Sequence, residues 1–322
     1  MLKYLLKRIG LMILTFIITV FLFFLFIKLM PDNHIPPIGS DNAWYEFMSA
    51  KEGWDKPIPV QFLLWIRNIF TSGSFGFSQY YRDDVGKYYF SKIPASIRIN
   101  IFPYLLSVPL AIMIGVVAAL NKGKWIDTVI SIGIMVFISV PYFVVVVLSQ
   151  YFLYFRWGVV PDYKIATPSE FISMGTWYGI STYIFPVIVL TITSIPGFAR
   201  SVRAELTEQL TQDYMLLARS KGLSKRQATY RHALKNALVP FLPGIFIGII
   251  GVMYGGLITE RLFRVDGTGS IYLTAFQNIP PDYPMLMLVN TFGQFITLIS
   301  GIIGDISYTL FDPRVRVGSG KI

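Results

Sequence analysis

The sequence has no cysteine and only two histidines, His34 and His232, in 322 residues. Disulfide bonds, catalytic thiolates and zinc–thiolate centres are therefore excluded, and so is a histidine-rich metal site. Charged residues are also scarce, at 14% of the chain, where a soluble domain has about a quarter. The apolar residues, 54% of the chain, thus have too few charged neighbours to form the core of a soluble domain.

Several catalytic signatures are missing as well. The sequence has no Gly-x-x-x-x-Gly-Lys-Ser/Thr motif, so we expect no nucleotide-phosphate site in this chain. It also has no Gly-x-Ser-x-Gly motif, no His-Glu-x-x-His motif and no pair of intramembrane aspartates. A membrane enzyme such as an intramembrane protease is therefore disfavoured, and we expect a protein that is not an enzyme.

What the chain does have is long apolar runs, each near the 20 or so residues that cross a bilayer. They predict an all-α integral membrane protein with six transmembrane helices in one domain, residues 1–322. Pro141 interrupts the third run, and Pro186 and Pro196 lie in the fourth. The predicted spans are about 9–30, 99–120, 128–155, 182–198, 238–259 and 285–311.

The first run resembles a signal peptide, because Lys3, Lys7 and Arg8 precede it. It is about 22 residues long, however, which exceeds a signal-peptide apolar region. No small-x-small cleavage site follows Met30. We interpret it as an uncleaved first span.

The basic residues predict the orientation. With both termini in the cytoplasm, 16 Lys and Arg residues fall in about 66 cytoplasmic residues, and 11 fall in about 120 external residues. Acidic residues show the opposite bias, with 12 outside and 5 inside. The net charge of +10 is therefore explained by a positive-inside membrane protein, and a nucleic-acid partner is not expected.

The predicted external region, residues 31–98, is long enough to have structure of its own. Residues 60–69 are apolar and predict a short interfacial helix with Trp65 at headgroup depth. A lid that packs on the outer ends of the spans is the preferred interpretation of the whole region. Contact with an external partner remains open.

Two features inside the spans are candidates for packing or for a transport pathway. The fifth span has Gly-x-x-x-Gly spacing, which lets helix backbones approach closely, and its candidate residues are Gly248, Gly251 and Gly255. Asp305 lies deep in the sixth span, and a buried acid is a functional candidate. We prefer a structural hydrogen bond for it, because a proton-coupled transporter needs a chain of such groups.

The predicted cytoplasmic loop 199–237 is long for a simple connection, and its pattern is helix, glycine, helix. Asp213 begins the first helix, and Gly222 ends it because glycine adopts the left-handed conformation without strain. Ser224 can cap the second helix. A helix pair at the membrane surface suits a docking element, although a basic surface helix that binds lipid headgroups is an alternative.

This loop resembles the EAA loop of ABC importer permeases, in the form found in the oligopeptide and dipeptide permease family. The resemblance covers nearly the whole chain, including Met1–Arg8, the Ser139-Val140-Pro141 stretch and residues 312–316. The general pattern has Glu-Ala-Ala where this chain has Leu216, Leu217 and Ala218, so a salt bridge from that acid is not carried over. The matching loop residues are Asp213, Tyr214, Ala218, Arg219, Lys221, Gly222 and Leu223, followed by residues 231–238 and Pro240.

The resemblance implies a type I ABC importer (MetI-like) fold and alternating access driven by other subunits. The helix before Gly222 would sit in a groove of an ATPase, with Ala218 allowing close approach and Arg219 and Lys221 at the rim. The implied partners are a second homologous permease, two ATP-binding subunits that hold ATP and magnesium, an extracytoplasmic binding protein, a peptide substrate and the lipid bilayer. The implied location is the cytoplasmic membrane of a prokaryote.

Alternatives remain for the substrate and for the class. Members of this family also carry nickel, glutathione or oligosaccharides. A stand-alone channel or secondary transporter is the alternative of a different class, and the docking-like loop argues against it.

Overall fold

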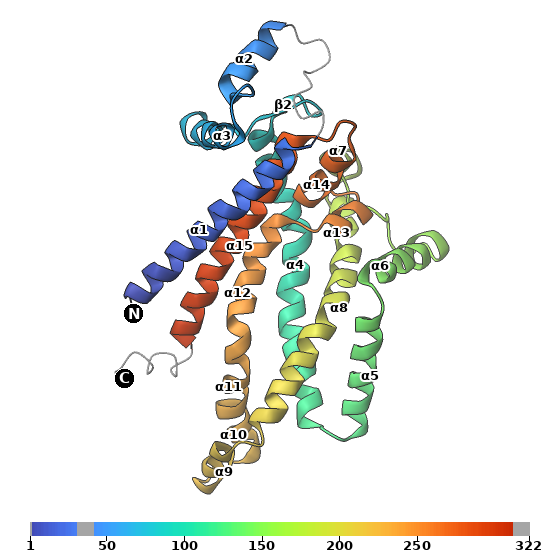
Figure 1. The fold of residues 1–322 in the computed structure, drawn as a ribbon. Coiled ribbons are helices and arrows are strands. Elements are labelled where there is room, and N and C mark those ends of the chain that lie inside the picture. Colours follow the sequence, from blue (N-terminus) through green and yellow to red (C-terminus); the bar gives the residue numbers. More distant parts are fainter. Residues whose placement is uncertain (1, 31–41, 312–322) are drawn as a thin grey trace. The chain divides into compact units, whose positions relative to one another are not determined.

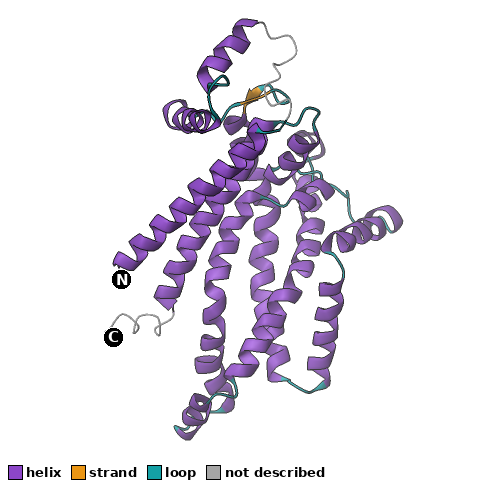
Figure 2. Cartoon of the chain, in the orientation of Figure 1, coloured by secondary structure: helices purple, strands orange, loops and turns teal. Residues whose placement is uncertain are grey.

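The structure is a computed structural model that describes residues 2–30 and 42–311 (Figure 1). Helices make up most of the described chain, and one short antiparallel ribbon pairs Phe77 with Asp84 and Ser78 with Asp83 (Figure 2). In the N-terminal part the elements are α1 (Leu2–Lys28), α2 (Asn42–Glu52), α3 (Ile58–Ser72), β1 (Phe77–Ser78), β2 (Asp83–Asp84) and α4 (Val85–Leu120).

The central and C-terminal parts contain the remaining elements. The central ones are α5 (Trp125–Ser139), α6 (Tyr142–Gln150), the π-helix η1 (Tyr151–Arg156), α7 (Pro168–Met174), α8 (Thr176–Gln209), α9 (Asp213–Ser220), α10 (Lys225–Ala228), the π-helix η2 (Thr229–Ala233) and α11 (Leu234–Leu238). The last ones are the 3₁₀-helix η3 (Val239–Phe241), α12 (Leu242–Gly251), the 3₁₀-helix η4 (Val252–Tyr254), α13 (Leu257–Leu262), α14 (Thr268–Gln277) and α15 (Tyr283–Phe311).

The chain divides into two compact units, which are described separately below. Unit 1 comprises residues 1–97, 253–260 and 266–302. Unit 2 comprises residues 98–252, 261–265 and 303–322. The boundaries fall inside α4, η4, α13 and α15 and in the connection between α13 and α14.

Five continuous helical segments of the described chain are long and apolar enough to cross a membrane: residues 6–28, 85–120, 176–209, 225–254 and 283–307. The segment 225–254 is the uninterrupted run from α10 to η4. A sixth candidate is the pair formed by α5 and the continuous α6–η1 helix. The predicted all-α membrane architecture is confirmed. The C-terminal residues 312–316 that supported the family resemblance lie outside the described residues.

The third predicted span, 128–155, is two helices that meet at an angle of 91°. Pro141 stands directly before α6, and Val140 before it is extended, with φ −91° and ψ 124°. Proline lacks a backbone N–H and disfavours the helical conformation of the preceding residue, so the helix stops there. The sequence marked the interruption correctly, but it did not indicate so large a bend.

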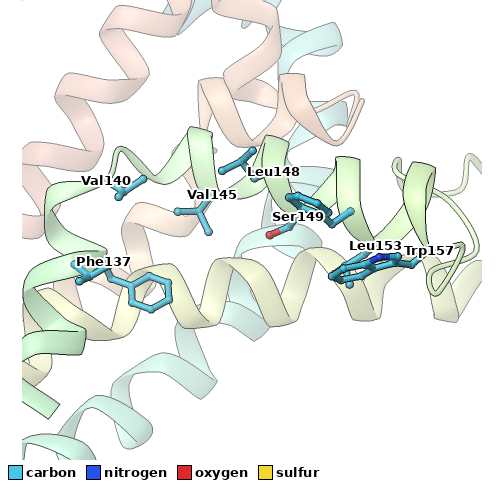
Figure 3. A pocket seen from close by; sticks show the side chains of 9 residues that line it. Phe137, Val140, Val145, Leu148, Ser149, Leu153 and Trp157 are labelled. Atoms are coloured by element: carbon cyan, nitrogen blue, oxygen red, sulfur yellow. The ribbon is translucent and has the colours of Figure 1, made fainter. Parts of the chain in front are cut away.

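An apolar cavity of about 400 Å³ lies in this bend, within unit 2 (Figure 3). Phe137 lines it from α5, and Val145 and Leu148 line it from α6. Its polar groups are the Ser149 hydroxyl and the Trp157 indole N–H. The remaining lining residues are Val136, Val140, Phe152 and Leu153.

Two other predicted spans differ from the helices observed. The fourth, predicted at 182–198, belongs to α8, which begins at Thr176 and continues to Gln209 with Pro186 and Pro196 inside it. The first part of the predicted loop 199–237 is therefore helix. The fifth, predicted at 238–259, ends at Tyr254, because Gly255 has a positive φ of 77° and turns the chain.

Unit 1 has a core in which α1, α3, the start of α4 and α15 supply most of the buried side chains. α1 and α15 lie side by side in Figure 1, and Gly301 on α15 faces the Met12 side chain on α1. The predicted external loop 31–98 thus holds α2, α3, the ribbon and the first turns of α4 in its described part.

Candidate functional site

The loop predicted to dock an ATPase is a compact helical unit in unit 2. Elements α9, α10, η2 and α11 follow α8 and pack on it and on the end of α4 (Figure 1). The buried core between them is rich in small residues: Ala119, Ala218, Ala228, Ala233 and Ala237 with Val116, Val202, Leu206 and Met215. The small side chains allow the short helices to approach closely.

The turn between α9 and α10 has the predicted construction. Gly222 has φ +87°, in the left-handed region that favours glycine, and the Leu223 N–H donates to the Ala218 carbonyl at 3.3 Å. Ser224 then caps α10, since its hydroxyl accepts from the Gln227 N–H at 3.2 Å while the Gln227 side chain accepts from the Ser224 N–H at 3.0 Å. This is a capping box. The predicted helix end at Gly222 and cap at Ser224 are both confirmed.

The inner face of α9 fixes it to the rest of the loop. Met215 and Ala218 are buried, and Tyr214 and Leu223 pack against the same core. The Tyr214 hydroxyl also donates to Gln209 Oε1 at 2.8 Å, which ties α9 to the end of α8. Ala218 therefore faces the loop's own core, and its role in close approach to an ATPase stays a prediction.

The outer face of α9 carries a different set of residues. Leu216 and Leu217 are 65% and 57% exposed. Asp213, Arg219 and Lys221 are exposed around them. The sequence comparison does not single out the two leucines, because they only depart from the Glu-Ala-Ala pattern of the EAA loop. The signal that could have found them is helical spacing, since residues 215 and 218 on one face leave 216 and 217 on the other.

An ion pair holds the end of α8 that carries this loop. Arg203 Nε donates to Asp127 Oδ1 at 2.6 Å, and a second guanidinium nitrogen donates to Oδ2 at 2.8 Å. Asp127 is buried in the first turn of α5, and it also accepts from the Gly123 N–H at 3.0 Å. This two-point geometry is stronger and more directional than a single contact.

Three of the candidate pathway residues, Gly248, Gly251 and Asp305, belong to unit 2. Gly248 faces the ring of Tyr104: a Cβ at Gly248 would stand only 2.4 Å from the Tyr104 hydroxyl oxygen, and that hydroxyl donates to the Ile245 carbonyl at 2.6 Å. Gly248 therefore serves close packing in unit 2. Gly251 has open space where a side chain would stand. Asp305 is half-buried on α15.

Gly255 belongs to a second site, in unit 1, that the sequence did not reveal. Glu260 is fully buried there. Its carboxylate accepts from the Ser270 N–H at 2.9 Å and from the Gly256 N–H at 3.3 Å. A Cβ at Gly255 would stand 2.4 Å from Glu260 Oε1, and one at Gly267 would stand 2.5 Å from Oε2. The glycines therefore make room for the carboxylate.

Glu260 belongs to α13, but its carboxylate lies at the beginning of α14, where unpaired backbone N–H groups favour an anion. The neighbouring Ser96 and Thr268 hydroxyls are 2.9 Å apart, and the Thr268 N–H donates to Ser96 at 2.8 Å. Burial raises the pKa of the Glu260 carboxyl, and the hydrogen bonds from its neighbours oppose that shift. The Glu260 cluster thus joins α4, α13 and α14 through one buried acid.

Comparison with known proteins identifies the class. Residues 111–317 match the binding-protein-dependent transport system inner membrane component family, and residues 1–108 match its N-terminal region. The dipeptide transport system permease protein DppB of Lactococcus lactis is 30% identical, over 98% of this chain and 100% of its own length. The Bacillus subtilis DppB is 26% identical over 98% and 99%. The oligopeptide permease OppB of Mycoplasma genitalium is 28% identical over 100% and 78%.

The chain belongs to the family of binding-protein-dependent transport system inner membrane components. It is a multi-pass membrane permease component of an ABC importer, located in the inner membrane. Membership implies partner ATPase and binding-protein subunits.

Proposed function

We propose that this chain is one of two homologous permeases in an importer of dipeptides or oligopeptides. The observation that supports the substrate is that relatives matching nearly all of this chain carry the names of dipeptide and oligopeptide permeases. A second permease is needed because the six candidate spans of one chain are too few to enclose a transport pathway across the membrane. Both termini would lie in the cytoplasm, as the basic residues favour.

The proposed docking site for an ATPase is the outer face of α9. Two exposed leucines flanked by Asp213, Arg219 and Lys221 form an apolar patch with a charged rim, which is the usual composition of a protein interface. The inner face of the same helix is fixed by Met215 and Ala218. A force on Leu216 and Leu217 would therefore move the whole loop and the end of α8.

Energy would come from two ATP-binding subunits, which would hold ATP and magnesium, and this chain would have no ATPase site of its own. ATPase closure would shift the loop and change the access of the path from one side of the membrane to the other. An extracytoplasmic binding protein would deliver the peptide and set most of its specificity. The Glu260 cluster would keep the 255–282 segment in place during this cycle.

The test is copurification of ATPase subunits with the tagged chain from gently solubilised membranes. We expect capture by the wild type and loss of capture with Leu216→Asp and Leu217→Asp, because a charge in the centre of the patch opposes burial. Thr211→Asp is the matched control, since Thr211 is exposed two residues before α9 begins. Gly222→Asp tests the turn, whereas Ala218→Asp would disrupt the loop core itself.

Uptake of labelled peptides in cells that express the intact system tests the substrate. Uptake that requires this chain and fails in the two leucine variants supports the proposal. If no ATPase copurifies and transport survives both variants, a stand-alone transporter is the better explanation. If ATPase capture is normal but only nickel, glutathione or oligosaccharides are carried, the importer is correct and the peptide assignment is wrong.

A further inference from the structure

Helix α3 in unit 1 presents an apolar face that nothing in the described chain covers. Val60, Leu63 and Phe70 are 38%, 65% and 85% exposed. Together with the exposed Arg67 they follow spacings of three, four and three residues, so they lie on one side of the helix. Fifteen residues give α3 a length of about 22 Å, and the face runs along most of it.

The opposite face of α3 packs on α1. The Phe62 ring is 5.1 Å from Phe21 and 5.4 Å from Phe24, measured between ring centroids. Trp65 is 5.9 Å from Phe24, and its indole N–H donates to the Phe75 carbonyl at 3.2 Å. Trp65 thus belongs to the inner face of α3, and its predicted position at headgroup depth stays a prediction.

The buried Gln61 also fixes the rotation of α3. Its side-chain amide donates to the Lys56 carbonyl at 2.8 Å, just before the helix begins. With Gln61 and Phe62 held inside, the side that carries Leu63 and Phe70 must point away from α1.

The depth of α3 follows from the residues that it contacts on α1. α1 is a candidate span over residues 6–28. Only 11% of its most apolar 18-residue stretch is buried against the rest of the chain. Phe21 lies seven residues before the end of α1 at Lys28, which corresponds to about 10 Å along the helix. α3 therefore packs beside the end of the apolar segment and not beyond it.

The direction of α3 fits this depth. In Figure 1 α3 is seen almost along its axis, while α1 is seen from the side, so the two helices are not parallel. A helix that lies across the end of a membrane span can lie near the membrane plane. Its outward face then points sideways from α1, at the level where hydrocarbon meets headgroups.

We propose that α3 is an interfacial helix that inserts Val60, Leu63 and Phe70 into the bilayer surface beside α1. This face of α3 matches both regions of the bilayer surface. Its apolar side chains enter the acyl boundary, and the Arg67 guanidinium reaches lipid phosphates. The proposal does not depend on which side of the membrane α3 occupies or on what the protein transports. A bound external protein on the same face is the competing occupant.

The test is spin-label accessibility in the full chain, purified with the subunits that accompany it and reconstituted in liposomes without binding protein. The chain has no cysteine, so Leu63→Cys and Phe70→Cys each give one nitroxide position. Exposed Ile18 on α1 provides the hydrocarbon reference, and exposed Lys122 in the α4–α5 turn provides the aqueous one. A complex with the unsubstituted chain is labelled in parallel. Because this chain has no cysteine, its signal gives the background from cysteines of the other subunits.

We expect labels at 63 and 70 to collide readily with oxygen and several-fold less with a water-soluble nickel chelate than the label at 122. Equal chelate access at 63, 70 and 122 would overturn the proposal and leave the face free for an external protein. Low access to both oxygen and chelate would also overturn it, because protein would then cover the face. Copurification of the accompanying subunits with the same variants shows that the labelled chains are folded.

Discussion

Arg203 on α8 binds Asp127 on α5 through two parallel hydrogen bonds, and Asp127 is held in turn by the Gly123 N–H. Arg203 stands six residues before the end of α8, next to the core of the α9–α11 loop. The pair therefore joins the proposed docking loop to the helix that leads into the 91° bend at Pro141. We infer that displacement of the loop is transmitted to α5 through this contact.

Asp127→Asn is expected to lower the stability of the chain, because asparagine cannot accept both guanidinium bonds and leaves the arginine uncompensated. Removal of one partner of a fully buried pair costs about 3–5 kcal/mol. Here about 1–3 kcal/mol is expected, since the Arg203 side chain is 32% exposed. Thermal unfolding in detergent measures it.

The same variant should also reduce peptide uptake more than ATPase activity in the assembled complex. Ser131→Ala is the matched control, since Ser131 makes only one long contact, 3.3 Å, to the same carboxylate. Unchanged stability and uptake in Asp127→Asn would contradict the proposed transmission.

Gly222→Val is expected to weaken the α9–α10 turn by about 1–2 kcal/mol, because a left-handed conformation is costly for a β-branched residue. Space is not the cause, since nothing lies within 4 Å of a Cβ at this position. Gly222→Asn should be tolerated better, because asparagine adopts this conformation more readily. Limited proteolysis of the loop distinguishes the two variants, and equal protection of both would contradict the conformational explanation.

Ala218→Leu is expected to destabilise the loop by about 1–3 kcal/mol, because the added atoms overpack its alanine-rich core. Leu217→Ala should leave the melting temperature nearly unchanged, since Leu217 is exposed, but it should weaken ATPase capture. Melting curves and pull-downs of both variants separate folding from docking. The assignment of inner and outer faces is wrong if the two variants exchange these effects.

Glu260 predicts a pH effect in unit 1. Its pKa is raised by burial, so its contribution to stability is complete below the ordinary glutamate pKa and is lost as pH rises through the folded-state value. The melting temperature of the wild type relative to Glu260→Gln should therefore rise as pH falls from about 7.5 to 4.5. A difference that stays flat over this range would contradict the raised pKa.

Glu260→Ala tests the cluster in a second way. It leaves the Ser270 and Gly256 N–H groups without their acceptor, and a buried unpaired donor costs about 1–3 kcal/mol. Exposed Glu208→Ala is the matched control, and it should leave the melting temperature unchanged.

Features that depend on a few neighbouring residues could be predicted from the sequence. The turn at Gly222 and the cap at Ser224 are of this kind, as are the long apolar runs. The 91° bend could not be predicted, because Pro141 indicates a break but not its angle. The Glu260 cluster could not be predicted either, since Ser96 and Ser270 have no periodic relation to the acid.

The inward position of Ala218 was missed for another reason. A small residue fits both a close contact with a partner and a close contact within the chain, and its type does not distinguish them. Only the burial of Met215 and Ala218 together shows which face of α9 is internal.

The alanines at 218, 228, 233 and 237 make the docking loop a rigid unit. Alanine side chains have no alternative rotamers and hold neighbouring backbones in contact, so the packing between the helices changes little when one helix is displaced. A small displacement applied at α9 would then reach α8 and α11 almost undiminished. In a core of leucines or methionines, changes of side-chain rotamer would accommodate part of the displacement, and less of it would reach α8 and α11.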